Sequence, residues 1–240
     1  MKKLIFTFAL LTLIIVQSHA FAGSLGDPFD GGVLKNPDWK WQNEPNWDLG
    51  KTNNGWLHIN TANNQNLWDV DTVSKLYQLV DMDRLDISTH LVMEYKGTSS
   101  CVSGLVIKSP TDVNWTTMKF WGRGADAVIQ WQHKAQEVVG TVPGSNQPAG
   151  RTEVFIRIVK SGDEYTGYWK KLANDDWIEV TPHATKALKA PLEVGIFAGN
   201  CEAGGTMTAE FEFFDDLITP YAAVDSSGKC ATIWASLKAF

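Results

Sequence analysis

The chain has 240 residues, and its 27 acidic against 21 basic side chains give a net charge of −6 at pH 7. This balance disfavours nucleic acid and anionic membranes as partners, because both are normally bound through clustered Lys and Arg. The length suffices for one well-filled core of a size common among β-sandwiches.

The N-terminus has the pattern of a secretory signal peptide. Lys2 and Lys3 precede an apolar run over residues 4–16, and the small residues at 20–22 (Ala-Phe-Ala) offer a cleavage site. The apolar run is shorter than the roughly 20 residues that cross a bilayer as a helix. We therefore expect residues 1–22 to be removed and the mature chain to be exported, secreted or periplasmic, with no membrane anchor.

The remainder of the chain is typical of an all-β protein. Short runs of β-branched and aromatic residues are bounded by Gly, Asn, Asp or Pro, and no 3.6-residue period is sustained. The predicted strands span residues 56–60, 75–79, 87–95, 102–108, 116–121, 127–132, 153–160, 164–170, 178–180, 192–197 and 207–214. Residues 141–150, rich in Pro and Gly, are predicted to cross between sheets. The pattern indicates a two-sheet antiparallel β-sandwich over residues 23–220, followed by a C-terminal tail at 221–240.

Three cysteines allow one disulfide within an exported chain. Cys101 and Cys201 both lie in Gly/Ser-rich turns beside similar buried-strand runs, whereas Cys230 lies in the tail. We therefore predict a disulfide between Cys101 and Cys201. The cysteine spacing shows no Cys/His ligand cluster, so a structural zinc site is not expected.

Several segments resemble a known family. Residues 27–32 (DPFDGG), 38–45 (DWKWQNEP) and 55–59 (GWLHI) resemble the opening of the concanavalin A-like domain at the C-terminus of family 43 glycoside hydrolases, and of related stand-alone domains. Strand patterns in the family's order continue to about residue 218. The resemblance implies a jelly-roll sandwich associated with plant or microbial polysaccharides. The sequence contains no counterpart of the propeller that precedes this domain in those enzymes, so the domain either binds glycans alone or serves another role.

Tryptophan is abundant, with 11 in the chain, and its flat rings suit the C–H-rich faces of sugars as well as a sandwich core. Strand alternation separates the two roles, because Thr116, Met118 and Phe120 should face the core and the residues between them the opposite side. Exposed Trp115, Trp121 and Lys119 would then form a sugar platform. The predicted carbohydrate-binding residues are Trp68, Trp115, Lys119, Trp121 and Arg123. The tryptophans predicted to lie in the core are Trp39, Trp131, Trp169 and Trp177.

Paired carboxylates could indicate glycoside hydrolysis instead. Glu210 and Glu212 alternate on one predicted strand and would share a face about 7 Å apart. However, the Glu-x-Asp-x-x-Glu run of catalytic concanavalin A-like glucanases is absent, and acid-out, apolar-in alternation is ordinary for a half-buried strand. A solvated strand face is therefore the preferred interpretation of this pair.

Calcium is the one metal that the acidic residues favour. Asp27 and Asp30 open the domain while Asp215 and Asp216 close it, and first and last strands often lie side by side. The same residues also serve commonly as turn formers, which is the simpler interpretation. No cofactor is required by any motif in the chain.

Three functional hypotheses follow, of which a non-catalytic, exported carbohydrate-binding domain is preferred. A glycoside hydrolase or lyase using Glu210 and Glu212 is the second. An extracellular protein-interaction module that kept the fold without a sugar site is the third.

Overall fold

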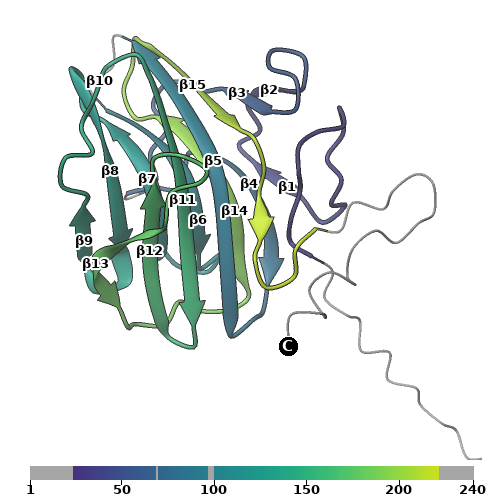
Figure 1. The fold of residues 1–240 in the computed structure, drawn as a ribbon, viewed down its shortest axis with the longest axis vertical. Helices are drawn as coiled ribbons and strands as arrows, with labels where there is room; N and C mark the ends of the chain where they lie inside the picture. The colour runs from purple at the N-terminus through teal and green to yellow at the C-terminus, as the bar shows by residue number, and fades with distance from the viewer. Residues whose placement is uncertain (1–23, 69, 97–99, 222–240) are drawn as a thin grey trace, which may run out of the picture.

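The computed structural model describes residues 24–68, 70–96 and 100–221. The predicted signal peptide and the tail beyond residue 221, with Cys230, lie outside the described residues. The described chain forms two eight-stranded sheets packed face to face, with all strand pairs antiparallel, which confirms the predicted sandwich (Figure 1). No helix in this part of the chain is long and apolar enough to span a membrane.

The first sheet has the strand order β1-β4-β14-β6-β7-β8-β10, with β9 also paired to β8. Its strands are β1 (Lys40–Gln42), β4 (Ser74–Val80), β14 (Leu192–Asn200), β6 (Cys101–Lys108), β7 (Trp115–Gly122), β8 (Asp126–His133), β9 (Val138–Thr141) and β10 (Gln147–Pro148). A single turn of 3-10 helix, η1 (Lys134–Gln136), follows β8.

The second sheet has the order β13-β12-β11-β5-β15-β3-β2, with β16 also paired to β5. Its strands are β13 (Ile178–Ala184), β12 (Glu164–Lys170), β11 (Arg151–Ser161), β5 (Arg84–Lys96), β15 (Thr206–Phe211), β3 (Leu57–Asn60), β2 (Asn46–Leu49) and β16 (Asp215–Asp216). Each predicted strand corresponds to one strand of the structure. The missed strands, β1, β2, β9, β10 and β16, have two to four residues each. Residues 141–150 do cross between the sheets, because β10 pairs in the first sheet and β11 in the second.

The core lies between the sheets and is built from alternate residues of both. Met118 and Phe120 of β7 face it, as predicted, and so does Trp131 of β8, which is 0% exposed and donates its indole N–H to the Pro182 carbonyl at 3.1 Å. Trp39 and Trp169 are partly buried and pack against this core.

The prediction that Trp177 lies in the core was wrong, because the residue does not pack in the core cluster. Its ring lies 4.8 Å from Lys170 Nζ and 5.7 Å from Arg157 Cζ. The residue follows an exposed turn over 171–176, where strand alternation no longer fixes which side a ring faces.

The first and last described segments meet. Asp27 and Phe214 form an isolated antiparallel bridge with reciprocal 2.8 Å hydrogen bonds, and the Leu25 N–H donates to Asp216 Oδ2. The chain therefore enters and leaves the sandwich at one place.

Candidate functional site

A second, smaller apolar cluster covers the outer face of the first sheet, on the side away from the core. It contains Leu67, Val73, Val102, Val106, Trp115 and Phe197, with Trp121 and Cys201 packed against it. The predicted sidedness of β7 is thus confirmed, because Trp115 and Trp121 lie opposite Met118 and Phe120. Such a cluster outside the main core marks a place where another segment must cover the sheet.

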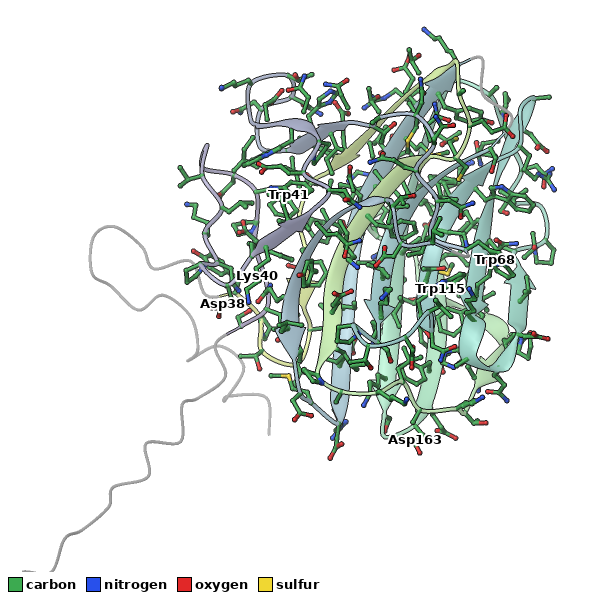
Figure 2. All side chains as sticks on the ribbon, turned by 180° about the vertical axis from the view of Figure 1, so that it is seen from behind. Asp38, Lys40, Trp41, Trp68, Trp115 and Asp163 are labelled. Atoms are coloured by element: carbon green, nitrogen blue, oxygen red, sulfur yellow. The ribbon has the colours of Figure 1, made fainter. Side chains whose placement is uncertain are left out.

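That segment is the loop between β3 and β4, described at residues 61–68 and 70–73 and called here the covering loop. The indole N–H of Trp115 donates to the Leu67 carbonyl at 2.9 Å, and the Trp68 ring packs edge-on against Trp115 with centroids 5.6 Å apart. Figure 2 shows Trp68 and Trp115 together on this face. Lys134 Nζ donates to the Trp68 carbonyl and lies 5.5 Å from its ring centroid. The loop thus places an aromatic ring over the sheet.

The covering loop changes the expected site. Trp115 is only 2% exposed and Lys119 5%, so they are not the open platform that was predicted, whereas Trp68 is 46% exposed. What the loop and sheet enclose is a cavity of about 300 Å³, a volume at the lower end of the range for small-ligand pockets. Its lining residues are Asn66, Leu67, Trp68, Ser100, Val102, Trp115, Lys119, Trp121, Gln130, Gln132, Phe197 and Cys201.

Four of the predicted carbohydrate-binding residues, Trp68, Trp115, Lys119 and Trp121, therefore line one cavity. Arg123 does not line it. Its guanidinium makes two hydrogen bonds to the Asp126 carboxylate, at 3.0 and 2.7 Å, and lies 5.8 Å from the Trp121 ring at the end of β7.

Polar residues that sequence reasoning missed complete the lining, chiefly Gln130 and Gln132 of β8. The register pairs Gln130 with Lys119 and Gln132 with Thr117, so both amides lie on the same outer face as the lysine. Their alternation with core Trp131 already implied an outward direction. The pairing of β8 with β7, which brings them to the cavity, is a tertiary contact that alternation does not reveal.

Lys119 supplies the cationic group of the cavity. Its Nζ donates to Thr117 Oγ1 at 3.2 Å and to Gln132 Oε1, and it lies 5.4 Å from the Trp115 ring centroid. Burial removes water from the ammonium and lowers the pKa of Lys119 from 10.5 to about 7.

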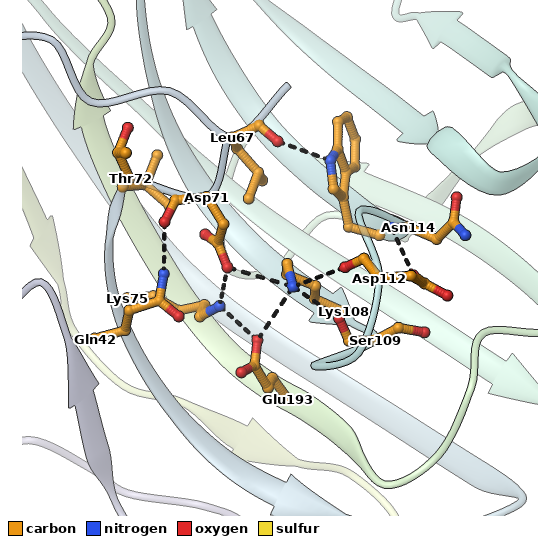
Figure 3. A network of polar contacts seen from close by, with 12 residues as sticks. Gln42, Leu67, Asp71, Thr72, Lys75, Lys108, Ser109, Asp112, Asn114 and Glu193 are labelled. Atoms are coloured by element: carbon orange, nitrogen blue, oxygen red, sulfur yellow. Dashed lines mark hydrogen bonds and ion pairs between the residues drawn. The ribbon is translucent and has the colours of Figure 1, made fainter. Parts of the chain in front are cut away.

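An ionic network adjoins the cavity on the same face (Figure 3). Lys75 Nζ lies 2.5 Å from Glu193 Oε2 and 2.9 Å from Asp71 Oδ2, and Lys108 Nζ lies 3.4 Å from the same Asp71 oxygen. Asp71 belongs to the covering loop, whereas Lys75, Lys108 and Glu193 lie on β4, β6 and β14. The network therefore fixes the C-terminal end of the covering loop to three strands of the sheet.

The predicted disulfide is absent, because Cys101 and Cys201 are both free thiols in this structure. Cys101 packs in the core between the sheets, whereas Cys201 packs against the cluster on the outer face. The register explains this difference: Cys101 pairs with Asn200, so Cys201, the next residue, points to the other side of the sheet.

Glu210 and Glu212 are each held by a separate histidine on the outer face of the second sheet. Glu210 lies 3.3 Å from His58 Nδ1 and 3.1 Å from Arg151, and it is 7% exposed rather than solvated as expected. Glu212 lies 2.6 Å from His90 Nδ1.

Three of the four acids considered for calcium, Asp27, Asp30 and Asp216, have other partners. The Asp27 carboxylate accepts N–H bonds from Phe29, Lys35, Asn36 and the Trp39 indole, at 2.7–3.1 Å. Asp216 accepts from Ile218 and Thr219, and Asp30 pairs with Lys35. Across the described residues, no group of three or more His, Cys, Asp or Glu side chains could hold a metal ion. A carboxylate surrounded by N–H donors suits turn formation, not a cation.

No protein-family model and no curated protein matches the sequence. Solved structures do match in fold. A family 43 glycoside hydrolase protein (GH43) from Bacillus licheniformis superposes with a TM-score of 0.61 at 18% identity, over 79% of this chain and 38% of that one. A Bacteroides ovatus GH43 protein from a xyloglucan locus gives 0.61 at 20% identity, over 80% and 38%.

A protein of unknown function from Saccharomyces cerevisiae, also matched in fold, has a TM-score of 0.55 at 13% identity, over 75% of this chain and 96% of that one. The chain thus spans well under half of the two hydrolase chains but nearly all of the yeast one. At these identities the similarity establishes the fold, and it confirms the concanavalin A-like resemblance at that level.

Proposed function

We propose that this chain is an exported, non-catalytic carbohydrate-binding domain, and that the cavity beneath the covering loop is its sugar site. The observation that carries the proposal is the combination of three tryptophans with two glutamine amides and a lysine around one opening. Aromatic rings offer apolar surfaces to pyranose C–H groups, while amides and amines hydrogen-bond hydroxyls.

The rings have distinct roles in this proposal. Trp115 is buried and bonded to Leu67, so it forms the floor. Trp68 and Trp121 are more exposed and stand at the opening, where a sugar ring can stack on them. The two glycoside hydrolase proteins of similar fold support a polysaccharide as the ligand, because this chain shares the fold of part of each. Export is part of the proposal and rests on the N-terminal pattern.

A pull-down on insoluble polysaccharides, with a glycan array beside it, tests the proposal. Trp68→Ala and Trp121→Ala should each weaken binding about tenfold, because a stacked ring contributes on the order of 1.4 kcal/mol. Trp177→Ala removes a partly exposed ring from the second sheet and is the matched control, expected to bind like the wild type. If both cavity variants still bind, the sugar site lies elsewhere on the domain. If the wild type binds no glycan, the protein-interaction hypothesis is favoured.

A further inference from the structure

Three lysines are buried on the outer face of the first sheet, and they differ in their partners. Lys75 and Lys108 are neutralised by the carboxylates of Asp71 and Glu193. Lys119, which lies in the cavity itself, has a hydroxyl, an amide oxygen, an aromatic face and the Cys201 thiol near it, and no carboxylate among the described residues that line the cavity. A buried ammonium without a counter-ion is unfavourable. Lys119 therefore lacks the stabilising carboxylate that Lys75 and Lys108 each have among the described residues.

The described side chains around Lys119 are neutral. Trp115, Thr117 and Trp121 come from β7, Gln130 and Gln132 from β8, Val102 from β6, Phe197 from β14, and Trp68 from the covering loop. Among the described residues that line the cavity, Cys201 is the one titratable neighbour of Lys119, and burial raises the pKa of its thiol, so it stays neutral. No carboxylate is found among the described residues that line the cavity.

We propose that the natural ligand is an acidic glycan, and that the carboxylate of a hexuronate unit pairs with Lys119 Nζ inside this cavity. The inference rests on the proposed function and specifies its substrate class. A carboxylate is the group that would complete the site in the way that Asp71 and Glu193 complete the neighbouring lysines. Its charge-assisted hydrogen bonds replace the water that burial removes.

The pairing predicts a direction of pH dependence. In the free protein the Lys119 amine loses its proton near pH 7, and a bound carboxylate would raise that pKa. The uronate stays ionised above about pH 5, because a carboxyl pKa is about 4. Affinity should therefore be greatest between pH 5 and 7. It should fall as pH rises above 7, by up to about tenfold per pH unit, with proton uptake on binding at pH 8.

Calorimetric titration of the full mature chain tests the inference, using oligogalacturonides and glucuronate-bearing xylo-oligosaccharides against their methyl esters. The esters keep the sugar rings and remove the charge. At pH 6 the acid should bind at least about tenfold more tightly than its ester. Lys119→Met should abolish that preference, so that the variant binds the acid and its ester with equal affinity.

The outcomes separate the two proposals. Equal binding of acid and ester, or a preference that survives in Lys119→Met, would overturn the uronate inference and leave glycan binding intact. Failure of every glycan to bind would overturn the proposed function itself. If Lys119→Met does not fold, the wild type still decides, because affinity for the acid that does not change between pH 6 and 9 would contradict the role of Lys119.

Discussion

Lys75 and Glu193 form an ion pair on the outer face of the first sheet, with Nζ 2.5 Å from Oε2 and the lysine side chain fully buried. The pair joins β4 to β14, its neighbour in the sheet, and Asp71 extends it to the covering loop. The stability of the cavity roof therefore depends on charges that lie outside the cavity.

Glu193→Gln should destabilise the domain by about 3 kcal/mol, because it leaves the buried Lys75 with Asp71 as its remaining carboxylate partner. Urea unfolding followed by tryptophan fluorescence measures the change. The double variant Lys75→Met, Glu193→Leu is the control and should lie within about 1 kcal/mol of the wild type, since it removes both charges together. A single variant as stable as the wild type would show that the pair contributes little.

His133 should make the domain acid-sensitive. The residue is 0% exposed and bonded to Thr116 Oγ1, and burial lowers its pKa from 6.5 to about 4. Between these values the unfolded chain binds a proton that the folded chain does not, so stability falls as pH drops from 6.5 to 4, by about 3 kcal/mol in total. Unfolding free energies at pH 7 and pH 4 should therefore differ less in His133→Gln than in the wild type. Parallel profiles for the two proteins would contradict this assignment.

The two described thiols should differ in reactivity. Burial raises the pKa of Cys101 to about 12, whereas Cys201 lines the cavity and is only partly buried. Because the thiolate is the nucleophile, iodoacetamide on the native protein at pH 8 should label Cys201 before Cys101. Peptide mapping by mass spectrometry assigns each label, and Cys201→Ser provides the control. A recovered peptide linked through Cys101 and Cys201 would show that oxidation rearranges this corner of the sheet.

Strand alternation predicted the local features well. In the run from Trp115 to Trp121, alternate residues fall on opposite faces, so the sidedness of β7 follows from the sequence. The longer strands carry enough alternating residues to be recognised. Most of the shortest strands do not, and β9 and β10 were missed, although β3, which also has four residues, was predicted.

Features that depend on distant segments were harder to predict. The contact between Trp68 and Trp115 depends on the covering loop folding over the sheet, and alternation within β7 cannot distinguish an exposed ring from a covered one. The disulfide prediction failed for a related reason. Proximity of two turns was inferred correctly, since Asn200 pairs with Cys101, but a shift of one residue places Cys201 on the opposite face.

The bridge between Asp27 and Phe214 bears on how the domain can be displayed. Both residues pack near Trp39, just before the edge strand β1, whereas the cavity lies over β6, β7 and β8 towards the other edge. Attachment through either end of residues 24–221 therefore leaves the cavity open. Several copies fixed to one support could engage successive units of the same polymer, and their apparent affinity would rise by effective concentration without any new contact.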